Sequence, residues 1–182
     1  MERIFDELCK LLPLVTADDL IRFAPVLTEV IPELKPTLGF DQRNPHHAFD
    51  LYTHIAHVVE GVPPRLPLRW AALLHDIGKP KAKRPGSLPD GRPIITFYNH
   101  EKYSEEISQS LMTRLKFSKA QTAAVCHLVK NHMFHYESSW SDAAVRRFLY
   151  RVTPDAMEDL FDLRMADVYG MTRSPPVLKD GP

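Results

Sequence analysis

Apolar residues recur along most of the chain at the three- and four-residue spacing of a helix, and strand-like alternation is nearly absent. Prolines stand between these apolar segments. The pattern predicts an all-α protein, with a loop over residues 80–99 that contains at most a short hairpin around "DGRPIITFY". The expected helices cover residues 2–12, 17–24, 25–31, about 45–61, 67–77, 100–115, 118–133, 141–150 and 154–170.

Several boundaries carry residues that favour helix ends. Thr16 is expected to cap the second helix, with acidic residues in its first turn, and Asn99 can cap the helix after the loop. Prolines 32 and 36 are expected to end the third helical section. On the first helix, the predicted apolar face holds Ile4, Leu8, Leu11 and Leu12.

Four of the predicted helices place an ionisable side chain where an apolar one would fit. These side chains are His54, His75 with Asp76 beside it, His132, and Asp167 on the last helix. A single buried histidine or aspartate is most often a hydrogen-bonded core residue or a salt-bridge partner. Four helices with the same feature instead indicate that the polar groups converge, and imidazole with carboxylate is a typical ligand set for divalent transition metals.

Composition narrows the class of protein. The 182 residues suit one domain with a sizeable core, and Lys plus Arg balance Asp plus Glu at 23 each. This balance argues against extended nucleic-acid or membrane binding. The two cysteines, the lack of an apolar leader at the start of the sequence and the short apolar runs favour a reduced, cytoplasmic protein.

The order His54, then "LLHDIGKP" with His75 and Asp76, then "MADVYG" with Asp167 resembles the signature of the HD-domain metal-dependent phosphohydrolases. The segments "LGFDQRNPHHAFDLYTHIAHVVEGVP" and "DGRPIITFYNHEKYSEEIS" are similar to the HD segment of bacterial tRNA nucleotidyltransferases and poly(A) polymerase-like proteins. The resemblance implies an HD-domain helical bundle. We expect a helical extension at 1–40, an HD domain at 41–172 and an exposed tail at 173–182.

The resemblance also implies the site. His54, His75, Asp76 and Asp167 are expected to hold one divalent ion, and His100 and His132 a second, with Asp76 between them. We favour two ions over one. Mn, Fe, Ni, Zn, Co and Mg cannot be told apart from this ligand set. Such ions polarise a phosphate and lower the pKa of bound water. Asp76 is therefore an expected catalytic residue as well as a ligand.

Basic residues near this motif are candidates for binding phosphate oxygens. Lys79 is the strongest, as a catalytic and substrate-binding residue, while Arg84 and Arg92 lie in a basic stretch that could equally be a solvated loop. Arg164 could bind substrate or form a salt bridge with Asp167. Among the other histidines, His127 is expected to be exposed, His57 could line the pocket, and His46, His47 and His135 have no assigned role.

The sequence has no match to the glycine-serine turn and paired aspartates of a nucleotidyltransferase head, so nucleotide addition is not expected. The expected function is hydrolysis of a phosphate ester in a nucleotide, a cyclic nucleotide or an RNA end. The alternative is a nucleotide- or RNA-associated module that keeps the metal site for structure or regulation. The expected partner is a phosphate-containing small molecule or an RNA end, and the oligomeric state stays open.

Overall fold

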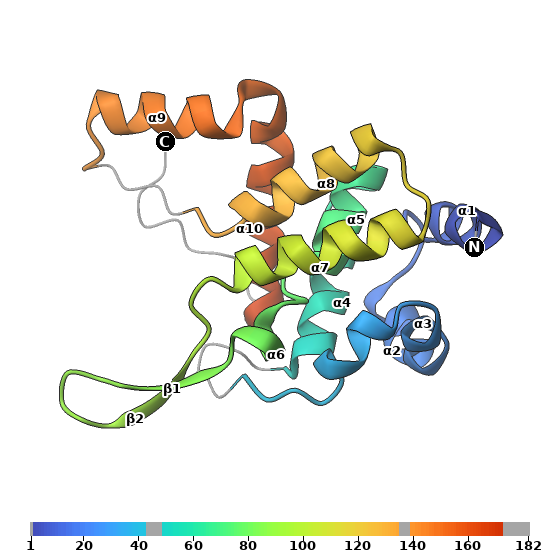
Figure 1. Cartoon of the computed structure of the whole chain (residues 1–182), viewed down its shortest axis with the longest axis horizontal. Coiled ribbons are helices and arrows are strands. Elements are labelled where there is room, and N and C mark those ends of the chain that lie inside the picture. Colours follow the sequence, from blue (N-terminus) through green and yellow to red (C-terminus); the bar gives the residue numbers. More distant parts are fainter. Residues whose placement is uncertain (1, 43–48, 135–138, 173–182) are drawn as a thin grey trace.

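In the computed structural model the described residues are 2–42, 49–134 and 139–172, and they form an all-α structure with one small hairpin (Figure 1). The predicted fold class is confirmed. The helices are α1 Glu2–Leu11, α2 Ala17–Arg22, α3 Ala24–Val30, the 3-10 helix η1 Pro32–Thr37, α4 Leu51–Gly61, α5 Leu66–Leu74, α6 Lys79–Ala82, α7 His100–Arg114, α8 Lys119–Asn131, α9 Asp142–Val152 and α10 Pro154–Thr172. The strands are β1 Arg84–Ser87 and β2 Pro93–Thr96.

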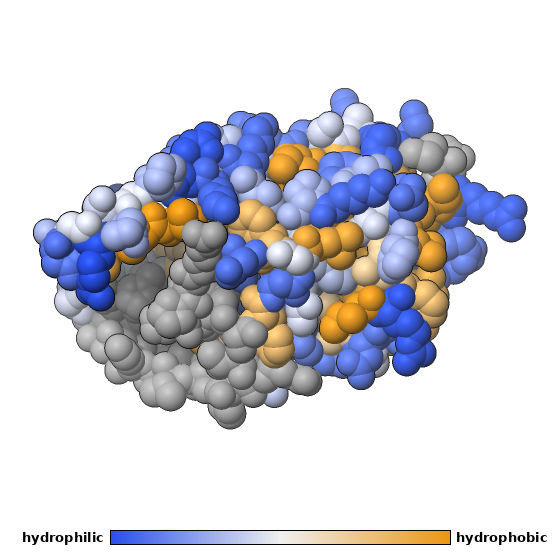
Figure 2. All heavy atoms as spheres, turned by 90° about the horizontal axis from the view of Figure 1, so that it is seen from below, coloured by the Kyte–Doolittle hydropathy of each residue, from blue (hydrophilic) through white to orange (hydrophobic). Residues whose placement is uncertain are grey.

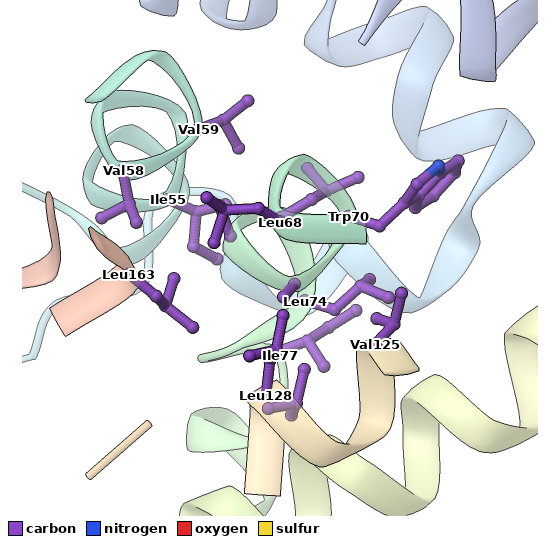
Figure 3. Packing of buried hydrophobic residues seen from close by; sticks show 14 of the residues in the cluster. Ile55, Val58, Val59, Leu68, Trp70, Leu74, Ile77, Val125, Leu128 and Leu163 are labelled. Atoms are coloured by element: carbon purple, nitrogen blue, oxygen red, sulfur yellow. The ribbon is translucent and has the colours of Figure 1, made fainter. Parts of the chain in front are cut away.

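Helix α5 lies at the centre of the core. All its residues from Leu68 to Leu74 are buried, and it contacts α4, α8 and α10. Figure 3 shows Ile55, Leu128 and Leu163 from these three helices gathered around it. The one charged side chain of this stretch, Arg69, is also buried and donates hydrogen bonds to the carbonyls of Leu12 and Val15. The chain that leaves the end of α5 therefore carries His75 and Asp76 into the core rather than to the surface.

The start of α4 differs from the prediction. Asp50 caps this helix, because its carboxylate accepts hydrogen bonds from the Thr53 N–H at 3.2 Å and from the Gly39 N–H at 2.7 Å. Phe49 and Asp50 are therefore not helical, and the predicted start near residue 45 is wrong there. Residues 43–48, which include His46 and His47, lie outside the described residues.

The predicted caps are confirmed in part. Thr16 forms a capping box with Asp19, as predicted. Ser118 and Ser141, which were not predicted as caps, also accept hydrogen bonds from the first turns of α8 and α9. Asn99 stands at the start of α7, but its backbone is left-handed (φ 62°) and its side chain makes no cap. The capping prediction for Asn99 is therefore wrong, because this residue serves as a turn into the helix.

The buried face of α1 is also displaced from the predicted one. Ile4 and Leu11 are exposed, at 38% and 53%. The edge of the Phe5 ring packs on Phe117, with ring centroids 4.3 Å apart. The inward face therefore consists of Phe5, Leu8, Cys9 and Leu12. A shift of one position keeps helical spacing while it selects the bulkier aromatic residue for the core.

Residues 32–37 continue as a helix instead of ending the section. The 3-10 helix η1 begins at Pro32 and tolerates Pro36 near its end. A short 3-10 segment leaves few N–H groups to satisfy, so proline costs little there. Leu34 in this segment and Ile31 directly before it are both fully buried and belong to the hydrophobic core.

The N-terminal helices pack on the rest of the chain through α2 and α4. The Tyr52 hydroxyl on α4 donates a hydrogen bond to the Leu20 carbonyl on α2, and burial raises the pKa of Tyr52 to about 12. The hydroxyl therefore stays protonated and able to donate across the accessible pH range. The proposed division near residue 40 stays a prediction, and residues 173–182 lie outside the described part.

Replacing Tyr52 by phenylalanine should lower the free energy of unfolding by about 1–2 kcal/mol. The ring still fills its space, but the buried Leu20 carbonyl loses its side-chain donor. Urea denaturation followed by circular dichroism measures the change. Phenylalanine in place of Tyr150, which is 90% exposed, is the matched control and should leave the midpoint unchanged. Equal midpoints for both variants and the wild type would contradict this interpretation.

The 80–99 loop contains the predicted short hairpin and one unpredicted helical turn. Strands β1 and β2 pair antiparallel from Arg84 opposite Thr96 to Ser87 opposite Pro93, and the hairpin projects away from the helices (Figure 1). Before it, α6 occupies residues 79–82 and packs on α7. No helix within the described ranges is long and apolar enough to cross a membrane. Outside the residues drawn in grey, the face in Figure 2 is mainly hydrophilic, with its hydrophobic residues in separate clusters.

Candidate metal centre

Six ionisable residues from five parts of the fold meet inside the helical core. His54 comes from α4, His75 and Asp76 follow α5, and Asp167 comes from α10. His100 begins α7, and His132 follows the last residue of α8. Each is at most 5% exposed. The sequence predicted that these residues converge, and the structure brings all six together in two groups whose potential ligand atoms lie within 4.8 Å of one another.

The first group consists of His54, His75, Asp76 and Asp167. The Nε2 atoms of His54 and His75 lie 2.9 and 3.2 Å from Oδ1 of Asp167. The same two nitrogen atoms lie 3.3 and 3.2 Å from Oδ2 of Asp76. Both imidazole nitrogens thus lie within 3.3 Å of oxygens from two carboxylates.

The second group shares Asp76 with the first. Oδ1 of Asp76 lies 3.1 Å from Nε2 of His100 and 3.4 Å from Nε2 of His132. The two oxygens of this one carboxylate therefore face different histidine pairs, Oδ2 the first pair and Oδ1 the second. This arrangement makes Asp76 the geometric bridge between the groups.

Backbone carbonyls orient three of the histidines. The Nδ1 atoms of His75, His100 and His132 lie 2.7, 3.1 and 2.6 Å from the carbonyl oxygens of Ala72, Phe97 and Val129. A carbonyl only accepts, so each Nδ1 carries the proton and donates it. In a neutral ring the lone pair is then on Nε2, which points into the centre. Metal-binding histidines in proteins are held in this way by a second hydrogen bond.

The donor set fits a divalent cation. The Nε2 atoms of His100 and His132 lie 3.2 Å apart, although both rings donate from Nδ1. Two neutral rings in this arrangement would face each other with lone pairs, which repel unless a proton or a metal ion lies between them. With carboxylate oxygens beside them, these nitrogens form the imidazole and carboxylate mixture that suits divalent transition metals. The identity of the ion stays open.

The electrostatics of the first group also favour positive charge. Burial opposes protonation of His54, but hydrogen bonds and attraction from Asp167 and Asp76 outweigh it and raise its pKa to about 8. The same balance, with Asp76 the strongest attraction, raises the pKa of His75 to about 10. Burial opposes ionisation of Asp76, but His75 and Lys79 hold its pKa well below the usual range. Two buried carboxylates therefore draw cationic charge to this place.

At His132, in the second group, burial outweighs the opposing effects. It lowers the pKa of His132, against the weaker effect of Asp76. This keeps the imidazole neutral at neutral pH, the form that binds a metal ion.

Lys79 lies at the edge of the centre, in a buried position. Its Nζ is 3.4 Å from Oδ2 of Asp76, donates to Oε1 of Gln42 at 2.7 Å, and lies 5.8 Å from the centre of the Phe97 ring. The sequence predicted a role for Lys79 beside the metal, and the structure gives it a position consistent with that role. Gln42 carried no signal in the sequence.

The three candidate arginines have different surroundings. Arg164 Nη1 lies 3.3 Å from Oδ2 of Asp167, which agrees with the salt-bridge alternative. Arg84, at the start of the hairpin, donates to the carbonyls of Lys81 and Lys83 just before it. Arg92 pairs with Asp90 at the turn of the hairpin. Neither hairpin arginine has a contact with the six central residues in the described structure. Their role in substrate binding stays a prediction.

The structure corrects the prediction that His127 is exposed. It is partly buried, and its Nε2 donates to the Val152 carbonyl at 2.7 Å. This bond links α8 to the end of α9, so His127 has a structural contact that helical spacing alone did not indicate. His57 is buried with its ring 4.7 Å from that of Phe49. His135 lies outside the described residues.

Two glycines allow the helices around the centre to approach. A Cβ on Gly78 would lie 2.4 Å from the Ser104 backbone nitrogen on α7, and the Gly78 N–H donates to the Ser104 hydroxyl at 2.9 Å. A Cβ on Gly170 would lie 3.0 Å from Val58 and 3.4 Å from the His54 ring. Neither glycine was assigned a role from the sequence, although the glycine in "HDIGKP" was a signal for a close approach.

Comparison with known proteins agrees with this geometry. The HD domain family model matches residues 46–170. Over 149 residues the chain is 34% identical to the A-adding tRNA nucleotidyltransferase of Deinococcus radiodurans, a match that covers 78% of this chain and 32% of that protein. Over 175 residues it is 33% identical to the CC-adding tRNA nucleotidyltransferase of Thermus thermophilus, covering 91% and 38%.

The chain belongs to the HD domain family. The resemblance expected from "LLHDIGKP" and its partner residues is thus confirmed, and the residues that carry it are those that meet in the core. The chain is also similar to the two tRNA nucleotidyltransferases over 78% and 91% of its own length. It spans about a third of the length of these two relatives.

Proposed function

We propose that this chain is a metal-dependent phosphohydrolase that acts on a nucleotide, a cyclic nucleotide or an RNA-terminal phosphate. The observation that carries the proposal is the bridging position of Asp76, whose two oxygens face separate histidine pairs. A carboxylate shared between two imidazole pairs is suited to hold two cations side by side, and paired cations are a common device for phosphate-ester hydrolysis.

In this proposal His54, His75, Asp76 and Asp167 hold one ion, and Asp76, His100 and His132 hold the other. When bound, such ions polarise the phosphorus–oxygen bond and lower the pKa of a water molecule. The carbonyls of Ala72, Phe97 and Val129 keep three imidazoles in the tautomer that this role needs. Because these hydrogen bonds exist in the structure, the ligands need little reorganisation before they bind.

In this proposal a water molecule attacks the phosphorus, and side chains of the centre and Lys79 assist the reaction. The oxygen of water forms a bond to phosphorus while the bond to the leaving oxygen breaks, a carboxylate of the centre accepts the proton from water, and solvent protonates the leaving oxygen. Lys79 attracts a non-bridging phosphate oxygen, since its ammonium group already lies 3.4 Å from Asp76. The buried position of Lys79 strengthens this attraction, because the charge is less screened there than in water.

The test is hydrolysis of bis-p-nitrophenyl phosphate and of 2′,3′-cyclic nucleotides by protein loaded with Mn²⁺, Ni²⁺ or Mg²⁺. We expect turnover with at least one of these ions and none after treatment with EDTA. Protein that contains metal by elemental analysis, yet hydrolyses none of these substrates, would overturn the proposal. That result would favour the alternative of a nucleotide- or RNA-associated module that keeps the metal site for structure or regulation.

Replacing Asp167 by alanine should reduce metal content. Asp167 Oδ1 contacts both histidines of the first group, so its loss leaves only one carboxylate there. We expect the bound metal, measured by elemental analysis after dialysis against metal-free buffer, to fall by about half while the ion held by the second group remains. The control is Asp162→Ala on the same helix, whose carboxylate pairs with Arg65 away from the centre. Full metal content in Asp167→Ala would contradict the ligand assignment.

A further inference from the structure

A pocket that neither the HD signature nor the proposed ligands explain lies next to the segment that follows His132. Its volume is about 500 Å³, within the range of small-molecule sites. The walls come from the residues that follow α8, from Trp140 before α9, and from α9 itself, and they include Phe134, Phe148, Arg147 and Arg151. Both arginines are exposed, so their guanidinium groups are accessible to a ligand in the pocket.

The pocket and the metal centre share one stretch of chain. His132, a member of the second histidine pair, is followed directly by Met133 and Phe134, which line the pocket. On the other side, the bond from His127 to the Val152 carbonyl ties α9 to α8. The segment that positions His132 therefore also forms one wall of the pocket.

The aromatic residues of the pocket form a packed group. Phe148 on α9 packs against both Phe134 and Trp140, with ring centroids 5.3 and 5.5 Å apart. Phe148 is buried, whereas Trp140 and Phe134 keep part of their surface accessible. Flat apolar faces of this kind stack on nucleobases of any sequence.

Two arginines supply positive charge at the same place. The Arg151 guanidinium lies over the Phe148 ring, 5.4 Å from its centre, and this contact restricts its position. Arg147 lies one turn earlier on α9 and also lines the pocket. Within the described residues, neither arginine forms an ion pair with a carboxylate. Guanidinium groups bind phosphate through paired hydrogen bonds, so this pair is suited to an anionic phosphate.

We propose that this pocket binds a nucleoside monophosphate unit of the substrate, its base against Trp140 and Phe134 and its phosphate against Arg147 and Arg151. The pocket would define the substrate class of the proposed hydrolase, and its link to catalysis rests on that proposed function. The metal centre would act on the phosphate next to the bound unit, and the pocket would select nucleotides over simpler phosphate esters.

Calorimetric titration of the metal-free protein with adenosine 5′-monophosphate tests the pocket by itself, since EDTA removes any ion that could bind phosphate. We expect saturable binding that is at least about tenfold tighter than binding of adenosine or of inorganic phosphate. Arg147→Ala and Arg151→Ala should each weaken binding of the monophosphate about tenfold or more. Trp140→Ala should weaken binding of adenosine and of the monophosphate alike, by about tenfold.

Arg146→Ala is the matched control, because Arg146 is exposed on the same helix but does not line the pocket. It should bind the monophosphate as the wild type does. Unchanged affinity in Arg147→Ala and Arg151→Ala, or no binding at millimolar concentration, would overturn the proposal. Inorganic phosphate binding as tightly as the monophosphate would also overturn it, since the base would then contribute nothing.

Hydrolysis of bis-p-nitrophenyl phosphate separates this inference from the proposed function. Arg146→Ala, which does not change the pocket lining, should hydrolyse this substrate at the wild-type rate. If the wild type lacks the activity but binds the monophosphate through Arg147 and Arg151, the hydrolase proposal fails and the pocket stands. If hydrolysis is present and the pocket variants bind normally, the pocket fails and the hydrolase stands.

Discussion

Replacing Asp76 by asparagine is expected to abolish phosphoester hydrolysis while the helical fold remains. Asparagine keeps the shape of the side chain but removes the charge that faces His75 on one side and His100 on the other. Loss of a residue that only orients a metal ligand by a hydrogen bond typically lowers activity or metal affinity by about 10- to 100-fold. Loss of the bridging ligand should therefore lower kcat/KM for bis-p-nitrophenyl phosphate by at least about 100-fold.

Two further measurements and one control variant complete this test. Elemental analysis should show that metal content falls for both groups, since Asp76 belongs to each. Circular dichroism should show wild-type helix content. Asp90→Asn, at the exposed turn of the hairpin, is the matched control and should keep full activity. If Asp76→Asn retained turnover within threefold of the wild type, the two-group centre would not be the site of reaction.

Replacing Gly78 by alanine is expected to separate the two halves of the centre. The added Cβ would lie 2.4 Å from the Ser104 nitrogen and 2.8 Å from the His100 carbonyl oxygen, both backbone atoms of α7. A backbone cannot turn aside as a flexible side chain does, so α7 must move away. His100 then loses its 3.1 Å approach to Asp76, while His54 and His75 keep theirs.

Two effects should follow from this movement of α7. Overpacking of this kind typically costs about 1–3 kcal/mol of the free energy of unfolding, which urea denaturation measures. The metal bound per chain should also fall, through loss of the ion held by the second group, and hydrolysis should fall with it. An unchanged urea midpoint together with unchanged metal content would show that Gly78 has no such positioning role.

Gly86→Ala in the hairpin is the control for this substitution. Its Cβ would lie 2.8 Å from the methyl group of Thr96 and 3.6 Å from the Ile94 side chain, on a pair of strands outside the centre. Ser104→Ala provides a second comparison, because it removes the hydrogen bond from the Gly78 N–H without forcing α7 outward. Metal content should stay at the wild-type level in both variants, so that a loss in Gly78→Ala reports the displacement of α7.

The sequence predicted most elements and the identity of the central residues because both depend on local patterns. Helical spacing of apolar residues, caps such as Thr16, and prolines between segments all act within a few residues. The ionisable residues stood out for the same reason, since His54 and Asp167 occupy positions on apolar faces where burial is costly without a partner. Resemblance to the HD family then supplied the expectation that these residues meet.

Tertiary structure alone decided how the residues meet. Oδ2 of Asp76 faces one histidine pair and Oδ1 faces the other because of how α4, α5, α7, α8 and α10 pack together. Helical periodicity contains no information about that packing. The contact of Lys79 with Gln42 and the contact of His127 with Val152 join residues 37 and 25 positions apart. Local patterns predict which side chains must be buried, but long-range packing determines the partners that they find there.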